Sequence, residues 1–191
     1  MIMNSEWRAR REDCVLLVID VQDRLIDTIV QNKELIRNIR ALIKTAIALD
    51  VSILATEQEK LGGTVSELEQ VLSGVPKVRK LAFSGCGVPE FVSNLKKSEK
   101  KTVVACGTEA HVCVLQTTLD LIQSGYKVVI PVDAISSHAA QDRDTAIRRM
   151  IEAGAVASTT ETLIYEWLEK AGTDEFRKVL EIVKERREVN A

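Results

Sequence analysis

The sequence predicts an α/β fold: a three-layer αβα sandwich built on a doubly wound, mostly parallel sheet of about six strands. Two observations predict it. Short apolar runs alternate with segments of helical periodicity along the whole chain. The run at 14–19 is continuously apolar, as a strand is when both faces of a parallel sheet are covered. The 191 residues, 46% of them hydrophobic, fit a single domain over residues 1–191 with a sizeable core.

Six apolar runs are the predicted strands of this sheet. In chain order they cover residues 14–19, 51–56, 75–80, 103–106, 127–132 and 155–158. The run at 75–80 is the weakest of the set. Two polar, glycine-containing stretches, at 57–63 and 83–87, are predicted loops.

Helical periodicity fills most of the segments between the strands. The clearest case is residues 32–50, whose aliphatic residues form one broad face. The other predicted helices are a short one opened by a capping box at 64–67, one from Pro89 to about Ser98, one over 112–122, one over 142–153 and a closing helix from Thr173. A second capping box is predicted at 158–161. The closing helix either caps the domain or packs on a second subunit, and its sequence leaves both open.

Composition excludes several classes of partner. The net charge is −2, and the Lys/Arg clusters near both termini are interleaved with acids, so we expect no nucleic-acid or membrane partner. No apolar run approaches the ~20 residues of a membrane span. Residues 1–13 contain no apolar core of a secretory signal, so we expect a cytoplasmic protein. With four cysteines, expected to be free thiols, and only two histidines, we expect no metal and no cofactor.

One stretch, residues 103–122, carries the most chemical information. It reads as a strand, a turn at Gly107 and a helix whose first turn contains Cys113. Unpaired backbone N–H groups and the helix dipole favour an anion there, which for cysteine is a thiolate. Cys113 is therefore a candidate nucleophile.

Two further residues are predicted to meet Cys113. Asp20 follows the first strand and Lys80 ends the third, so all three lie at the carboxyl edge of a right-handed doubly wound sheet. A carboxylate can accept the thiol proton, and a lysine can lower the thiol pKa. Backbone N–H groups at the turn before Cys113 can hold an oxyanion. Spacing alone leaves open an inert core thiol, an Asp that caps its turn and a solvated lysine.

Three motifs together resemble the isochorismatase-like cysteine hydrolases. They are V-L-L-V-I-D-V-Q-D at 15–23, K-L-A-F-S at 80–84 and G-T-E-A-H-V-C at 107–113. The chain is most similar to the branch called isochorismatase domain-containing proteins, through T-E-Q at 56–58, G-T-V-S-E-L at 63–68 and the run 107–121. The resemblance covers nearly the whole chain.

The resemblance implies a catalytic triad of Asp20, Lys80 and Cys113. In this family the cysteine forms a thioester, releases ammonia or an amine, and the acyl-enzyme is then hydrolysed. A cis peptide before the nucleophile, here Thr108–Glu109, would aim the Glu109 and Cys113 amides at the oxyanion. The substrate would be a small molecule, and the family habit implies a homodimer or homotetramer in which a neighbouring subunit donates residues to the site.

Two departures narrow the expected activity. Nicotinamidases bind a metal through D-x-H and a further histidine after the second strand, whereas residues 56–60 here read T-E-Q-E-K. True isochorismatases lack the nucleophilic cysteine. We therefore expect hydrolysis of a carbon–nitrogen, amide-type bond in a small molecule that the sequence does not name. The alternatives are an oligomeric binding or scaffold protein that retains the fold, and redox chemistry at Cys113.

Five more residues are possible substrate contacts: Gln22, Thr56, Gln58, Phe83 and His138. Gln22 supports its turn or faces the ligand, and Phe83 is core or pocket wall. His138 either lines the site or caps the next helix, and we favour the cap.

Two neighbours of the thiol are left open. His111 invites a Cys–His dyad, although residues so close on a turn usually point apart. Cys86 follows Lys80 in a loop, near enough to the expected pocket to contribute.

Overall fold

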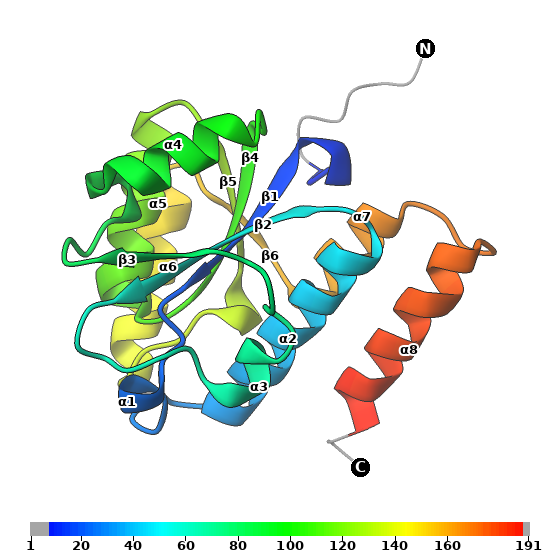
Figure 1. Cartoon of the computed structure of the whole chain (residues 1–191), viewed down its shortest axis with the longest axis horizontal. Coiled ribbons are helices and arrows are strands. Elements are labelled where there is room, and N and C mark those ends of the chain that lie inside the picture. The colour runs from blue at the N-terminus through cyan, green and yellow to red at the C-terminus, as the bar shows by residue number, and fades with distance from the viewer. Residues whose placement is uncertain (1–7, 189–191) are drawn as a thin grey trace.

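The computed structural model describes residues 8–188, and its sheet has the predicted architecture. Six strands form one sheet in the order β3-β2-β1-β4-β5-β6, and every neighbouring pair is parallel (Figure 1). The strands are β1 Cys14–Ile19, β2 Ser52–Gln58, β3 Lys77–Lys80, β4 Thr102–Gly107, β5 Lys127–Pro131 and β6 Val156–Ser158. Helices cover both faces, so the three-layer, doubly wound α/β fold is confirmed.

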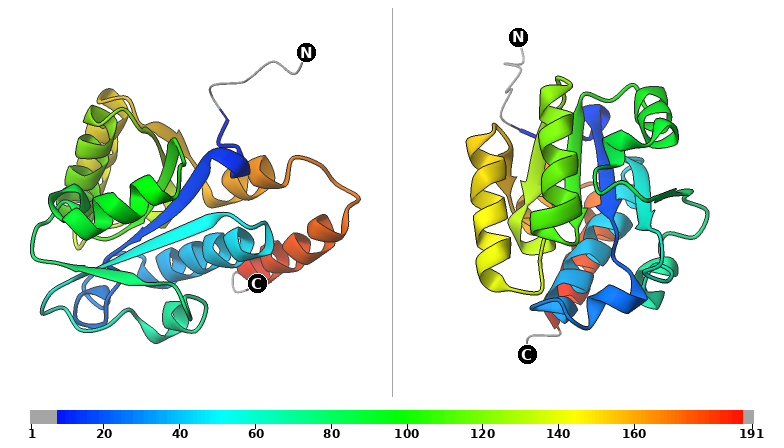
Figure 2. Two further views of the ribbon diagram at one scale, coloured as in Figure 1. Left: turned by 45° about the horizontal axis from the view of Figure 1, so that its top comes forward. Right: turned by 90° about the vertical axis from the view of Figure 1, so that its left-hand side faces the viewer.

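The helices divide between the two faces. Their bounds are α1 Asp23–Ile26, α2 Asn32–Ala48, α3 Ser66–Glu69, α4 Pro89–Lys97, α5 Leu115–Gln123, α6 Ala140–Glu152, α7 Thr160–Leu168 and α8 Asp174–Glu188, with a π-helical turn, η3, at Ala110–Val114. Short 3-10 turns lie at 11–13, 85–87 and 132–134. Helices α2, α7 and α8 lie on one side of the sheet, and α4, α5 and α6 lie on the other (Figures 1 and 2). None of the helices within 8–188 is long and apolar enough to cross a membrane.

The core consists of two apolar layers, one on each face of the sheet. Leu16 and Val18 of β1 belong to the layer under α2, while Leu17 and Ile19 belong to the layer under α4 and α5. Successive side chains of a strand point to opposite faces, so a strand buried on both sides is apolar at every position. This is why the continuous run at 14–19 gave the bounds of β1 correctly.

The closing helix α8 packs against this chain's own α2. Val179 and Val183 of its predicted apolar stripe are fully buried. Glu185 accepts hydrogen bonds from Arg40 and Lys44 of α2 at 2.7 and 2.6 Å. Within the described chain, α8 therefore caps the domain.

Both predicted capping boxes are wrong. Val65, not Thr64, is the N-cap of α3 and makes no side-chain cap bond, because the Thr64 amide and hydroxyl both donate to the buried Glu57 carboxylate at 3.0 and 2.8 Å. At α7 the N-cap is Thr159, which accepts from the Thr162 amide, rather than Ser158. In both cases tertiary contacts or a one-residue shift override the local motif.

The second strand is longer than predicted. Residues 57 and 58, predicted as loop, continue β2, and Gln58 pairs with Lys80 of β3. Two of the expected site residues are thereby fixed on neighbouring strands. Of the N-terminal stretch on which the cytoplasmic expectation rests, residues 1–7 lie outside the described residues.

Gly107, at the end of β4, is the glycine with the least room. Its φ is +125°, and a Cβ there would lie 2.0 Å from the Ile19 carbonyl oxygen of β1. We expect Gly107→Ala to lower the free energy of unfolding by about 2–3 kcal/mol through backbone strain and displacement of β1. Urea denaturation measures the loss. Gly125→Ala is the control, because Gly125 has φ +86° but no atom within 4 Å of the added Cβ, and equal losses in the two variants would contradict the steric argument.

Candidate active site

The site lies where the strand order of the sheet reverses. Between β1 and β4 the chain switches direction across the sheet, so the segments that follow these strands lead to helices on opposite faces. Open α/β sheets bind ligands in the crevice at this point. Asp20 follows β1, Cys113 lies in η3 after β4, and Lys80 ends β3 at the same edge.

Asp20 is held by contacts from three directions. It is buried and adopts a left-handed φ of +50°, which carries the chain out of β1. Its Oδ1 accepts a hydrogen bond from the Thr56 hydroxyl at 2.7 Å, and its Oδ2 accepts one from Lys80 Nζ at 2.6 Å. The Thr108 hydroxyl donates to the Asp20 carbonyl at 2.7 Å. The carboxylate therefore has one fixed orientation.

Lys80 is a fully buried ammonium with its donors satisfied. Its side chain is 0% exposed. Besides Asp20, Nζ donates to Gln58 Oε1 at 2.7 Å and to the Phe83 carbonyl at 3.1 Å. Three good acceptors match the three protons of the ammonium. Such a buried ion pair holds its geometry but is very sensitive to the loss of either partner.

The Cys113 thiol completes the group. The residue is 6% exposed and Sγ lies 3.8 Å from Gln58 Oε1, which also accepts from Lys80 Nζ at 2.7 Å, while Lys80 Nζ donates to Asp20 Oδ2. The charges of Asp20 and Lys80 both act on the thiol. The structure thus brings together the three residues that the sequence placed at one sheet edge.

The expected thiolate is not the resting form. Burial, the largest cause, and the Asp20 charge together raise the pKa of the Cys113 thiol to about 12 against the opposing effect of Lys80. Because Asp20 and Lys80 are paired with each other, their fields on the sulfur partly cancel and desolvation decides the outcome. Cys113 also lies in the π-helical turn that precedes α5 rather than in the first turn of a regular helix. Cys113 does lie at a helix start, as predicted, but the direction of the pKa shift runs against the predicted thiolate.

The turn before the thiol has the cis peptide that the family resemblance implied. The Thr108–Glu109 peptide is cis. The Glu109 carbonyl accepts from the Val112 and Val114 amides, whereas the Glu109 amide donates to no other residue of the described chain. That free N–H is available to a ligand.

Gln22 and Gln58 hold other groups of the site in place through hydrogen bonds. Gln22 is fully buried, donates to the Gln58 and Gly62 carbonyls at 3.0 and 2.7 Å, and accepts from the Gln58 amide at 2.8 Å. It is therefore a turn support. Gln58 contacts both Lys80 and the thiol, and the Thr56 hydroxyl donates a hydrogen bond to Asp20. Phe83 is 52% exposed beside this site and belongs to neither layer of the core.

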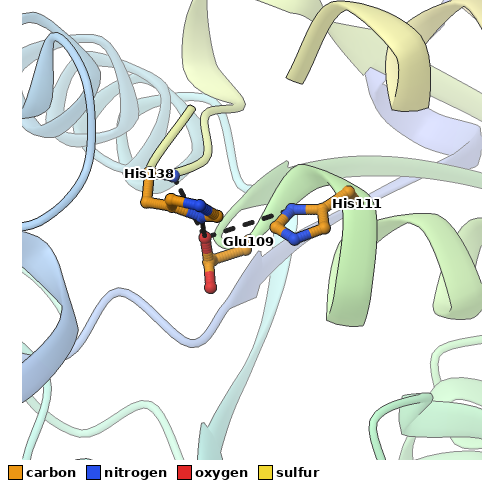
Figure 3. Close-up of side chains that lie close together, drawn as sticks. All are labelled: Glu109, His111 and His138. Atoms are coloured by element: carbon orange, nitrogen blue, oxygen red, sulfur yellow. Dashed lines mark hydrogen bonds and ion pairs between the residues drawn. The ribbon is translucent and has the colours of Figure 1, made fainter. Parts of the chain in front are cut away.

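The two histidines meet each other and not the thiol. His111 Nδ1 lies 3.0 Å from the Ser137 hydroxyl, and His138 contacts Glu109 through both its backbone N–H and Nδ1 (Figure 3). The favoured capping role of His138 is wrong, since Ala139 is the N-cap of α6.

All four cysteines are free, and burial raises the pKa of Cys86 to about 11.

Fold and site together define a doubly wound α/β protein with a buried Cys–Asp–Lys group at its switch point. The chain belongs to the isochorismatase family of the hydrolases, because the Isochorismatase domain model matches residues 14–162. It is 36% identical to isochorismatase domain-containing protein 2A of Mus musculus, over 95% of this chain and 87% of that protein.

Solved structures agree with this assignment. The MAR1 ribonuclease of Caenorhabditis elegans is 36% identical and superposes with a TM-score of 0.87, covering 93% of this chain and 92% of that one. The YcaC gene product of Escherichia coli, described as an octameric hydrolase of unknown specificity, has a TM-score of 0.86 at 21% identity, with 96% and 94% covered. The YcaC likeness shows the shared fold.

Proposed function

We propose that the protein is a cofactor-free cysteine hydrolase that cleaves the carbon–nitrogen bond of a small amide. The observation that carries the proposal is a buried thiol joined through Gln58 Oε1 to a buried carboxylate–ammonium pair whose charges act on the sulfur. Each member has the chemistry that one step of acyl transfer needs.

In the first half-reaction Asp20 takes the Cys113 proton as the sulfur attacks the amide carbon. Because the thiol is protonated at rest, proton transfer accompanies formation of the C–S bond. The carbonyl electron pair moves to oxygen, where the Glu109 and Cys113 amides donate to the oxyanion. The intermediate collapses with cleavage of the C–N bond, and the amine leaves with the proton held by Asp20.

In the second half-reaction water hydrolyses the thioester. Asp20 accepts a proton from the attacking water, the tetrahedral intermediate breaks its C–S bond, and the sulfur regains a proton from Asp20. The carboxylic acid product leaves, and the starting protonation states are restored. Lys80 balances the charge of Asp20 and fixes its Oδ2, while Gln58 fixes Lys80.

We also propose that the active form is a homodimer or homotetramer. Two large apolar side chains, Leu81 and Phe83, follow Lys80 and are 68% and 52% exposed. A second copy covering them would bury apolar surface beside the site and wall the substrate. The alternative function is a binding or scaffold protein that retains the fold without turnover. The following experiment distinguishes it from a hydrolase.

The decisive experiment traps the acyl-enzyme. The protein is incubated with a panel of small primary and secondary amides, with short RNA included because one relative is described as a ribonuclease. We expect release of ammonia or amine and, after acid quench, an acyl mass increment on the peptide containing Cys113. Cys113→Ser should show neither, and Cys86→Ser should keep both. Turnover that persists in Cys113→Ser, or no turnover on any amide, would count against the proposal.

A further inference from the structure

The only two histidines of the chain come together with a carboxylate. Glu109 directly precedes η3, His111 lies within it, and His138 lies in the loop before α6. His138 Nδ1 is 3.1 Å from Glu109 Oε2, and His111 Nδ1 is 4.0 Å from the same oxygen (Figure 3). One ligand atom from each residue lies within 4.8 Å of the others. Residues up to 29 positions apart in the sequence thus present three donors to one point.

The η3 turn and the loop before α6, which carry these donors, are joined by hydrogen bonds. The Ala110 amide donates to the Ser136 carbonyl at 2.8 Å, and the Ser136 amide donates to the Gly107 carbonyl at 3.3 Å. The His138 amide donates to Glu109 Oε2 at 3.0 Å. Backbone hydrogen bonds therefore fix the spacing of the donor residues, so that only side-chain rotations separate the observed cluster from a closed one.

We propose that Glu109, His111 and His138 bind a divalent transition-metal cation such as Zn²⁺ or Co²⁺. Two imidazoles and one carboxylate are the donor types that these ions prefer. Metal–donor bonds of about 2.0–2.2 Å place tetrahedral donors roughly 3.3–3.5 Å apart. The His138–Glu109 separation is already close to that value, and the His111–Glu109 separation reaches it when the His111 ring turns toward the carboxylate.

The surroundings supply what such a site needs. Asp142 Oδ2 lies 3.7 Å from His138 Nε2, where it can orient the ring whose other nitrogen binds the ion. The buried Ser137 hydroxyl lies 3.0 Å from His111 Nδ1, and the ring gives up this contact when the same nitrogen turns to the ion. Glu109 and Asp142 together offset the charge of a dication. The His138 side chain is 55% exposed, so an ion can enter from solution, and three protein donors leave a coordination position open.

This position differs from the metal site of nicotinamidases, whose histidines would fall at residues 56–60 of this chain. The expectation of no metal rested on there being only two histidines and on the absence of histidine from residues 56–60. The structure places them on adjoining loops, so the count alone does not exclude a site. The inference does not rest on the proposed hydrolysis: its donors are the Glu109 carboxylate and two imidazoles, whereas the proposed reaction uses only the backbone amide of Glu109.

Cobalt titration of the full chain tests the proposal. We expect saturation at one Co²⁺ per chain, visible ligand-field bands of nitrogen and oxygen coordination, and no near-ultraviolet band from sulfur. His111→Gln and His138→Gln should each raise the dissociation constant at least tenfold, as should Glu109→Gln. Glu152→Gln removes an exposed carboxylate outside the cluster and should bind as the parent does.

A Cys113→Ser background separates this site from the thiol and from turnover. Zn²⁺ should raise the melting temperature of that variant, because a ligand that binds only the folded state stabilises it, and should fail to do so when His138→Gln is added. A sulfur-to-cobalt band that Cys113→Ser abolishes, equal affinity in the histidine variants, or no saturable binding would overturn the proposal. Circular dichroism shows that each variant is folded.

Discussion

Asp20→Asn should abolish most of the turnover while making Cys113 easier to alkylate. Without its carboxylate the site has no group to accept the thiol proton, which lowers turnover of a substrate found by the amide screen by about 10²–10⁴-fold. The same carboxylate raises the pKa of the thiol. Its removal also leaves the Lys80 ammonium uncompensated beside the sulfur, so the thiol pKa falls and iodoacetamide, which reacts with the thiolate, labels Cys113 faster at pH 7.

Labelling is followed by mass spectrometry of the peptide that contains Cys113. Thr56→Val is the matched control, because it removes the 2.7 Å hydrogen bond to Asp20 Oδ1 but keeps the carboxylate and its contact with Lys80. This variant should label at nearly the parental rate. If Asp20→Asn labels no faster than the parent, the carboxylate does not control the thiol.

Lys80→Met should be the most destabilising substitution in the site. It leaves the Asp20 carboxylate buried without its partner, which costs about 3–5 kcal/mol when a buried ion pair is broken on one side. For a chain of this size that corresponds to a fall of roughly 6–20 °C in melting temperature. The Asp20→Asn, Lys80→Met double variant removes both charges and should regain much of the loss.

Thermal and urea denaturation of the four proteins form the cycle that measures the coupling. Lys77→Met is the control on the same strand: its 3.0 Å pair with Glu69 is partly exposed and should contribute under about 1 kcal/mol. A Lys80→Met loss as small as that of Lys77→Met, or strictly additive losses in the double variant, would contradict a coupled buried pair.

The sequence predicted the parts of the molecule that periodicity and topology control. The bounds of β1 followed from its continuous apolar run, and the meeting of Asp20, Lys80 and Cys113 followed from the rule that parallel strands end at one edge. Local motifs predicted less well. The capping box at Thr64 failed because the buried Glu57 competes for its donors, a contact that no short window of sequence contains.

The protonation state of the thiol and the geometry around the two histidines could not be predicted from the sequence, because both depend on contacts of the folded chain. The protonation of Cys113 depends on how completely Asp20 and Lys80 cancel and on how deeply the sulfur is buried, and both are properties of the assembled site. The approach of His111 to His138 depends on two loops joined by backbone hydrogen bonds. The sequence left open whether Gln22 supports its turn or faces a ligand, and the contacts of Gln22 with Gln58 at the end of β2 decide for support.

The protonated state of Cys113 also bears on how the protein withstands oxidants. Peroxide attacks the thiolate and oxidises it to sulfenic acid. Further oxidation makes the loss of the nucleophile irreversible. A sulfur that is buried and holds its proton at physiological pH offers little thiolate to that reaction. The desolvation that makes Cys113 a poor nucleophile at rest thus preserves it in reduced form until a bound carbonyl draws it into reaction.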